Sequence, residues 1–405
     1  MTDTDSRPVA ERRPVEPLRD VRVIDLTRIL AGPYATMILG DLGADVVKVE
    51  LPGHGDDSRH WGPPFVGGTA SYYTAVNRNK RSIAIDLKHE QGRDLVYRML
   101  GDADLLVSNF RPGVMDRLGF GHARLADTFP GLIRCSITGH APDDPRAQLP
   151  SFDLLIQAET GLMDLTGQAH GPPTKVGISI ADELAGLYLV QGVLAALYHR
   201  ERTGEGRAVN VALNEAMLSA FTYQAQKHLV GGGAPRRMGN EHPSLVPYRS
   251  YRAADGDFVV GVASEGQWAR FCAAIDRPDL AGDARFETNM VRVQNRAQLE
   301  GLLEARLAER SRETWIAELR AANVPCGLVQ TTAEAIDAEI ALGTGLVAEG
   351  ADGVKMVGSP IRIGGVRAPF GRPSPGLGEH TDEVLAELGL SMEQIAILRA
   401  RGVVA

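Results

Sequence analysis

The sequence predicts an α/β fold with a doubly wound, mostly parallel sheet of the Rossmann-like type and a smaller α+β domain. Apolar runs typical of β-strands alternate with helical segments over residues 21–138, and this alternation indicates a parallel sheet. The pattern changes after the glycine run at 231–233, and 405 residues exceed the length of one ordinary core. We therefore expect two domains, with a ligand crevice at the carboxyl ends of the parallel strands.

The sheet is predicted to start with the run VRVIDL at 21–26. A helix over 32–43 follows, with Pro33 as a first-turn residue and Gly43 as its end. One doubly wound sheet accounts for the rest of the alternation. Its remaining segments are strands at 45–50, 82–87, 104–110 and 132–138 and a helix near 89–101.

A strongly apolar helix is predicted to begin at Asp182. Residues 184–198 contain almost no polar side chain except Gln191, so we expect this helix to be buried on most of its surface. The run is shorter than the ~18 residues that a membrane span needs. An acid in a first helical turn is commonly an N-cap, and composition alone favours that role. The same position also keeps a carboxylate ionised beside an apolar wall, as a nucleophile requires.

Composition argues against several classes of protein. A net charge of −8 leaves no broad basic face, which argues against nucleic-acid binding. Cys135, Cys272 and Cys326 are far apart and odd in number, so we expect reduced thiols in a cytoplasmic protein without a CxxC metal site. Residues 1–18 have no apolar stretch, and we expect a mobile tail that is neither a signal peptide nor a membrane anchor.

The loops of the predicted sheet lack the glycine patterns of nucleotide-binding proteins. Glu50 ends the second strand, where an acid could hold a ribose, but no GxGxxG follows the first strand and no GxxxxGK[ST] is present. The sequence thus argues against a dinucleotide-dependent dehydrogenase, and any phosphate has to be bound by side chains. Basic residues cluster at 77–88 and 109–120, each beside a strand end, although such clusters are usually solvated surface.

Domain boundaries are expected where the composition changes. The glycine run 231–233 is most simply a helix stop and linker, a hairpin is expected around 253–256, and a functional role for His242 is left open. The expected organisation is a tail at 1–18, a large domain at 19–205 with 345–405, a linker helix and loop at 206–237, a small domain at 238–330 and a return linker at 331–344.

Several motifs together resemble the family III CoA-transferases, a group that includes formyl-CoA transferase, carnitine CoA-transferase and the 2-methylacyl-CoA racemases. The resemblance extends over nearly the whole chain, with the motifs in the same order. They are VRVIDLTRILAGPYATMILGDLGADVVKVELPGHGD (21–56), NRNKRSIAIDLK (77–88), NFRPGVMDRLGF (109–120), the Asp182 segment, TGEGRAVNVALNEA (203–216) and GEHTDEVLAELGL (378–390).

The resemblance implies that Asp182 matches the family's nucleophile. Its carboxylate would form a mixed anhydride with an acyl-CoA, take up CoA as a thioester and yield it to an incoming carboxylic acid. It further implies acyl-CoA and the acid as substrates, no permanently bound cofactor or metal, and an interlocked homodimer that binds neither membrane nor nucleic acid. The CoA-contact positions of the large domain fall on Ala31, Ile85, Asp86, Leu87, Lys88, Asn109, Phe110, Arg111 and Arg117.

Side-chain chemistry divides these positions. Lys88, Arg111 and Arg117 are suited to phosphate charge. Ile85 and Leu87 would serve as apolar contacts for the adenine.

Departures from the family pattern bear on the acyl substrate. Formyl-CoA transferase has Gln and Arg at the positions that Leu30 and Leu51 occupy in this chain. The basic CoA contact that the family usually has is missing in the region of Leu149 and Pro150. Oxalate and formate specificity is therefore not supported. We expect a less polar acyl site for a larger or more apolar acid, with succinyl-CoA as one possible donor.

Two alternatives to the transferase stay open. A racemase of this family needs a His directly before Asp153, but that residue is Phe152, which accepts no proton, and His140 lies some distance before it. The second alternative is a protein that binds acyl-CoA without turning it over. Phe152 favours the transferase over the racemase, and the nucleophile and the phosphate contacts favour it over the binding protein.

Overall fold

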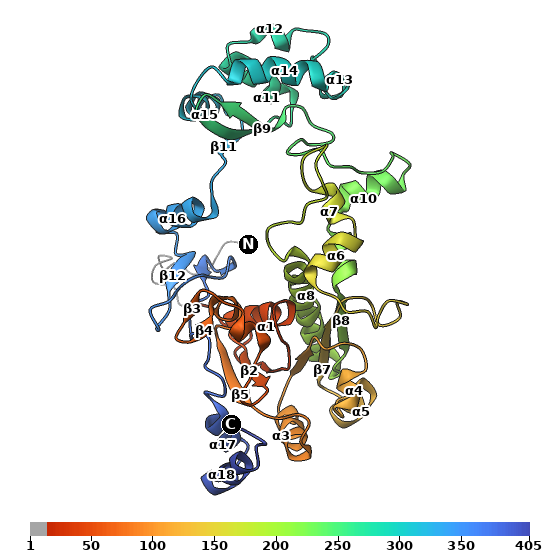
Figure 1. Cartoon of the computed structure of the whole chain (residues 1–405), viewed down its shortest axis with the longest axis vertical. Helices are drawn as coiled ribbons and strands as arrows, with labels where there is room; N and C mark the ends of the chain where they lie inside the picture. Colours follow the sequence, from red (N-terminus) through yellow and green to blue (C-terminus); the bar gives the residue numbers. More distant parts are fainter. Residues whose placement is uncertain (1–13) are drawn as a thin grey trace. The chain divides into compact units, whose positions relative to one another are not determined.

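The computed structural model describes residues 14–405, which form two compact units (Figure 1). The larger unit contains the described residues up to Thr160 together with Gly177–Gln226 and Glu339–Ala405. The smaller unit contains Gly161–Val176 and Lys227–Ala338. Each unit is therefore assembled from segments that lie far apart in the sequence.

The larger unit is built on a six-stranded sheet in which every strand is parallel to its neighbours. The strand order is β5-β2-β1-β6-β7-β8, which confirms the predicted doubly wound α/β fold. The strands are β1 (Arg22–Asp25), β2 (Asp45–Glu50), β5 (Lys80–Ala84), β6 (Leu105–Ser108), β7 (Ile133–Thr138) and β8 (Ala208–Ala212).

The order in which the chain adds strands reverses between β1 and β6, which are hydrogen-bonded neighbours. From β1 the chain adds β2 and β5 on one side, and from β6 it adds β7 and β8 on the other. In a parallel pair both carboxyl ends lie at the same edge, so the loops after β1 and β6 diverge there. Such a switch point leaves a crevice in which open α/β sheets bind their ligands.

Different helices cover the two faces of the sheet. Ile24, Val47 and Leu106 face a core formed with α3 (Glu90–Leu100), α5 (His122–Thr128), α17 (Thr381–Glu387) and α18 (Met392–Ala400). Their neighbours along the strands point to the other face, as strand geometry requires. On that face α1 (Ala31–Asp41) packs against α8 (Ile180–Thr203) (Figure 1).

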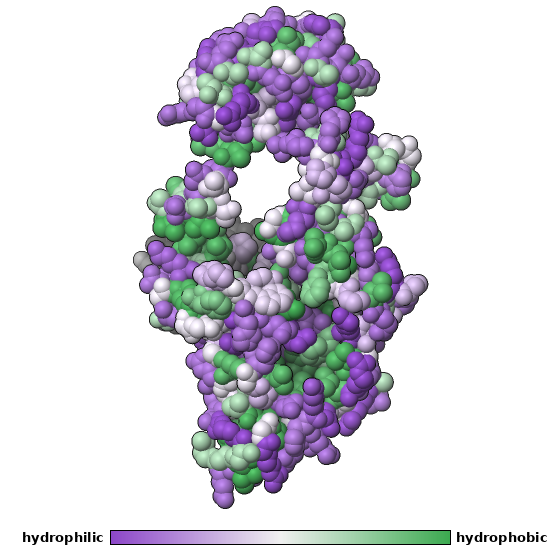
Figure 2. All heavy atoms as spheres, in the orientation of Figure 1, coloured by the Kyte–Doolittle hydropathy of each residue, from purple (hydrophilic) through white to green (hydrophobic). Residues whose placement is uncertain are grey.

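The helix α8 is less buried than predicted. One stripe is buried, with Ala185, Leu189 and Val193 among its members, while Leu194 and Tyr198 on the opposite side are 41% and 66% exposed. The prediction of a mostly buried helix was wrong because packing against α1, β7 and β8 covers only one side. Figure 2 shows hydrophobic surface where α8 and α6 (Asp153–Glu159) lie in Figure 1.

The length of α8 also exceeds the expectation. Within residues 14–405 it is the helix whose length and composition would allow it to cross a membrane, because its 24 residues extend beyond the apolar run at 184–198. Its buried stripe against α1, β7 and β8 is equally typical of a core helix.

Several boundaries differ from those expected from the sequence. The segment 206–237 was assigned to a linker helix and loop, but its edge strand β8 and its helix α9 (Leu213–Ser219) belong to the larger unit. Gly161–Val176 was assigned to the large domain and belongs to the smaller unit, where the Gly239 N–H donates to the Gly167 carbonyl at 3.0 Å. The larger unit resumes at Glu339, six residues before the expected 345.

The N-terminal prediction is partly outside the described residues. A mobile tail was predicted at 1–18, and residues 1–13 are not described. Leu18 is buried, and its N–H donates to the Leu42 carbonyl at 3.0 Å, so the end of this segment belongs to the core.

The smaller unit is the α+β domain that the sequence predicted. Its antiparallel sheet has the order β11-β10-β9, and the predicted hairpin joins β9 (Tyr248–Ala253) to β10 (Gly256–Gly261). Its core is formed around Trp268 and Trp315. The third strand of this sheet is β11 (Cys326–Leu328). The unit also contains the helices α11 (Glu265–Ala274), α12 (Pro278–Ala281), α13 (Asn289–Gln294), α14 (Arg296–Leu307) and α15 (Arg312–Ala321).

Candidate active site

The crevice between β1 and β6 contains a hollow of about 130 Å³, which we call the Asp182 hollow. The loop after β1 contributes Arg28 and Ala31 to its wall, and the loop after β6 contributes Asn109 and Arg111. Asp182 contributes a carboxylate to the lining. The other lining residues are Ile29, Leu30, Phe110, Pro112, Ile137, Thr138, Gly139, Ala147, Leu149, Ser151, Phe152 and Leu213.

A close helix contact brings Asp182 to this crevice. Asp182 is the third residue of α8, and Gly186 lies one turn further along the helix. A β-carbon on Gly186 would lie 2.9 Å from the Ala31 carbonyl oxygen, so only glycine allows the starts of α1 and α8 to approach this closely. The N-cap of α8 is Ser179, and the proposed N-cap role of Asp182 is therefore wrong.

The pKa of Asp182 is raised from its ordinary value to about 7. Burial is the largest cause, followed by the negative charges of Asp153 and Glu183. The carboxylate that was predicted to be ionised at the helix start is thus shifted toward its neutral form, because burial and two acidic neighbours raise its pKa. Near neutral pH the site holds Asp182 in both protonation states.

Asp153 connects α6 to the start of α8. One of its carboxylate oxygens accepts the Ala181 N–H at 2.9 Å, and the other accepts from the Gln157 side chain at 2.6 Å. The side chain is buried and its charge raises the pKa of Asp182. Asp153 thus both anchors the first turn of α8 and affects the protonation of Asp182.

A second hollow of about 190 Å³ adjoins the first, and we call it the Lys88 hollow. Ile85, Asp86, Leu87 and Lys88 line it, all from the segment after β5. Two residues, Arg28 and Phe110, line both hollows and therefore lie where they meet.

The predicted CoA-contact positions thus fall into two groups. Ala31, Asn109 and Arg111 line the Asp182 hollow, and the four residues from Ile85 to Lys88 line the Lys88 hollow. Arg117 is exposed at the end of α4 (Val114–Arg117) and lines neither. The structure brings all but Arg117 to one crevice that ends at a carboxylate.

Residues 18–381 match the model of CoA-transferase family III. The chain belongs to this family. A solved structure of a CaiB/BaiF family protein from Brucella suis has a TM-score of 0.83 and 40% identity, covering 93% of this chain and 100% of that one.

Curated relatives of this transferase carry CoA-transferase names. Human succinyl-CoA:glutarate CoA-transferase is 36% identical, covering 94% of this chain and 88% of that protein. Succinyl-CoA:mesaconate CoA-transferase of Haloarcula hispanica is 40% identical, with coverages of 92% and 96%. Acetyl-CoA:oxalate CoA-transferase of Acetobacter aceti is also 40% identical, with coverages of 89% and 92%. This chain is therefore a family III CoA-transferase, whose substrates are CoA thioesters.

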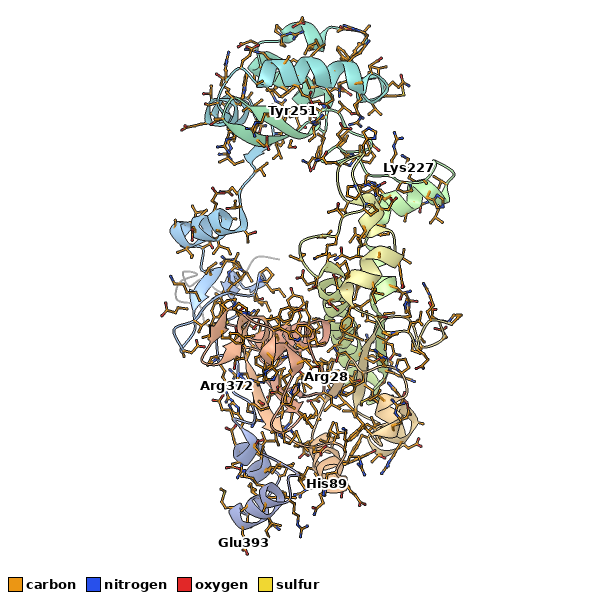
Figure 3. The ribbon with its side chains drawn as sticks, viewed as in Figure 1. Arg28, His89, Lys227, Tyr251, Arg372 and Glu393 are labelled. Atoms are coloured by element: carbon orange, nitrogen blue, oxygen red, sulfur yellow. The ribbon has the colours of Figure 1, made fainter. Side chains whose placement is uncertain are left out.

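The structure adds residues to the site of this transferase that the sequence did not single out. Arg28, labelled in Figure 3, is exposed where the two hollows meet, and its guanidinium lies 5.7 Å from the centre of the Phe110 ring. Tyr72 lines neither hollow and packs edge-on against Trp61 with ring centres 5.4 Å apart. Burial, and then the charge of Asp182, raise the pKa of Tyr72, and its side chain bonds to Ser179. Arg28 occurs inside a quoted motif, whereas no sequence pattern connects Tyr72 with Asp182.

Other candidates do not line either hollow. His140 is buried, with Nε2 3.6 Å from a carboxylate oxygen of Glu159. His242 and the run 231–233 belong to the smaller unit, where the Nδ1 of His242 accepts the Ser244 N–H at 3.1 Å. In the described part of the chain, no group of three or more His, Cys, Asp and Glu side chains is arranged to hold a metal ion.

Proposed function

We propose that this transferase moves CoA from an acyl-CoA to a carboxylic acid through covalent intermediates on Asp182. The observation that supports it is the carboxylate of Asp182 in a hollow lined by Ala31, Asn109 and Arg111. An exchange between two acids conserves the thioester energy only when a covalent intermediate holds it.

The reaction balances in four displacements. The ionised Asp182 attacks the donor's carbonyl carbon, the C–S bond breaks, and CoA leaves as a thiolate from a mixed anhydride. The thiolate attacks the Asp182 carbonyl carbon and releases the donor acid as a carboxylate. The acceptor carboxylate then displaces the thiolate from Asp182, and the thiolate attacks the acceptor's carbonyl carbon to give the new acyl-CoA and the free Asp182 carboxylate.

The predicted contacts give CoA a path to Asp182. The apolar side of the Lys88 hollow, with Leu87, suits the adenine, and Lys88 suits a phosphate. Arg111 supplies a further cation beside the acyl group, and Arg117 is exposed for a phosphate outside both hollows. These roles are proposed for the residues on the basis of their charge and place.

For the acids, we propose succinyl-CoA as donor and a dicarboxylic acid of several carbons as acceptor. The names of the relatives specify glutarate, mesaconate and oxalate. In the Asp182 hollow, the apolar Leu30, Leu149 and Phe152 suit methylene or methyl carbons, which oxalate lacks, and Arg28 and Arg111 suit a second carboxylate.

We also propose a homodimer, because the apolar stripe of α8 with Leu187, Leu194 and Tyr198 is exposed on the single chain. Mass photometry should show twice the mass of the 405-residue chain, and a monomeric mass would contradict the proposal. The interlocked topology and the cytoplasmic location stay predictions.

Intact-mass spectrometry tests the covalent step. The protein is incubated with succinyl-CoA and trapped with hydroxylamine or borohydride, and peptide mapping then locates the adduct. We expect modification of Asp182 in the wild type and none in Asp182→Ala, with Glu159→Gln, an exposed acid outside both hollows, as the matched control. Turnover by Asp182→Ala at the wild-type rate would contradict the mechanism.

A further inference from the structure

The loop between β1 and α1 contains a strained residue at the edge of the Asp182 hollow. Ile29 has φ of 71°, in the left-handed region that a β-branched residue rarely adopts. It lies between Arg28 and Ala31, which line the hollow. Such a conformation persists only where the surroundings hold it in place, and such residues cluster at functional sites.

The backbone of this loop is held by side chains from three other segments. Lys48 of β2 donates to the Thr27 carbonyl at 2.7 Å. Asn109, after β6, accepts the Arg28 N–H at 2.9 Å and donates to the Arg28 carbonyl at 2.7 Å. The Ile29 N–H donates to both carboxylate oxygens of Asp56 at 3.1 Å. The strained conformation is thus specified by side chains, since this part of the loop has left the sheet.

Asp56 is itself fixed by partners inside the protein. Lys48 donates to Asp56 at 3.0 Å, and both side chains are completely buried. The Asp56 N–H donates to Glu50 at 3.0 Å, and Ser58 donates to Asp56 through its N–H and its hydroxyl. Burial acts to raise the pKa of Asp56, but the charge of Lys48 and the bonds from Ser58 lower it to about 2. Asp56 therefore holds the loop as a carboxylate throughout the neutral range.

A purely stabilising role explains this arrangement poorly. A buried ion pair is weak evidence for stability, because well-packed apolar side chains of similar volume often serve as well. Apolar side chains would leave the Ile29 N–H without an acceptor, and Ile29 would be free to relax from its strained conformation. What the pair specifically provides is the conformation of the loop.

We propose that Asp56 is a positioning residue for the transfer reaction, which holds Arg28 and Ala31 in place beside Asp182 through the Ile29 N–H. The inference rests on the proposed function of Asp182. Ala31 lies against Gly186 of α8, so a shift of the loop would displace the start of α1 from the first turn of α8. A misplacement of about 1 Å costs on the order of 100-fold in rate, because reacting groups must meet at a defined distance and angle.

The first test compares Asp56→Asn with Asp104→Asn. Asp104 is a matched control, since it accepts hydrogen bonds from the Arg22 N–H and from the Arg200 side chain, each at 2.7 Å. It lies near the start of β1 and lines neither hollow. We expect Asp56→Asn to lower kcat by about 30- to 100-fold with KM for acyl-CoA within about threefold, because every partner of the Asp56 carboxylate is a donor and the new amide NH2 has to face Lys48, Ser58 or Ile29. Asp104→Asn should keep kcat within about threefold of wild type. Equal losses of kcat in both variants would contradict the proposal.

The second test keeps Asp56 and changes the backbone strain at position 29. Ile29→Gly and Ile29→Ala both remove the side chain beyond the β-carbon, but glycine adopts positive φ without penalty. We expect Ile29→Gly to melt at a higher temperature than Ile29→Ala and yet to have a lower kcat, because a glycine loop leaves the held conformation more easily. A merely structural role predicts that the more stable variant is at least as active, and that result would overturn the proposal.

These outcomes are distinguishable from failure of the proposed function. Wild-type kcat in both Asp56→Asn and Ile29→Gly, with Asp182 still labelled by succinyl-CoA, would refute the positioning role alone. Absence of label on Asp182 in the wild-type protein would refute the covalent mechanism, whatever the Asp56 variants do.

Discussion

Asp56 and Asp182 are both acids with little contact with solvent in the larger unit, yet their pKa values move in opposite directions. The pKa of Asp56 falls to about 2 and that of Asp182 rises to about 7. Burial raises the pKa of both. Lys48 and Ser58 more than offset burial at Asp56, whereas the neighbours of Asp182 are Asp153 and Glu183.

The difference in pKa separates Asp56, which stabilises a loop, from Asp182, which is available for chemistry. Asp56 uses its oxygens in bonds to Lys48, Ser58 and Ile29. Asp56 also lies at the wall of the Lys88 hollow, whereas Asp182 lines the other hollow, between loops that carry Arg28 and Arg111. An acid with a pKa near the working pH can change its protonation state during a reaction, whereas an acid with a pKa of about 2 cannot. Substitutions at the two acids should therefore have different effects.

Removing the reactive acid has the largest expected effect. Asp182→Ala should lower kcat for CoA transfer by at least about 10³-fold, because no other carboxylate among residues 14–405 lines the hollow. Isothermal titration should show an affinity for CoA within about threefold of wild type. A loss of CoA affinity that matches the loss of kcat would instead assign Asp182 a binding role.

Removing the cation beside the structural acid is expected to affect stability. Lys48→Met leaves the Asp56 charge buried without its partner, and we expect a loss of about 3–5 kcal/mol in the free energy of unfolding. Urea denaturation followed by circular dichroism measures this loss. Lys355→Met, at an exposed lysine of the same unit, should change the value by less than about 0.5 kcal/mol. Equal stability of the two variants would show that the buried pair contributes nothing.

The pKa of Asp182 predicts a pH dependence. Attack needs the carboxylate, so kcat/KM should rise with pH through about 7 and be about tenfold lower at pH 6 than on the plateau. Stability should change the other way, because the folded protein holds a proton that the unfolded chain releases between pH 3.8 and about 7. Asp182→Ala should therefore gain stability relative to wild type as the pH rises through that window. A rate independent of pH from 6 to 8 would contradict the raised pKa.

The smallest expected effect is at Asp153. Asp153→Asn removes a negative charge that raises the pKa of Asp182, while the amide oxygen can still accept the Ala181 N–H. The pH midpoint of kcat/KM should move down, giving about a two- to fivefold gain at pH 6 relative to the plateau. Glu159→Gln, an exposed acid at the end of the same helix, should leave the midpoint in place.

The sequence by itself determined the architecture and the family. Alternating apolar runs predicted the parallel sheet, and β2 has the bounds expected for it, because strand and helix periods are local properties of the chain. The family resemblance of the motifs also pointed to Asp182 and to eight further residues that line the two hollows. The assignment of 206–237 to a linker helix and loop was misplaced, because only the pairing of β8 with β7 shows that this segment belongs to the large sheet.

Only the tertiary structure decided how the acids behave. Asp56 and Asp182 are the same residue type in the sequence, and their pKa values depend on side chains that folding brings beside them. Asp153 reaches Ala181 across 28 positions, and Asn109 reaches Arg28 across 81. Local sequence patterns do not encode such distances, which is why the strain at Ile29 and the half-exposed α8 became visible only in the folded chain.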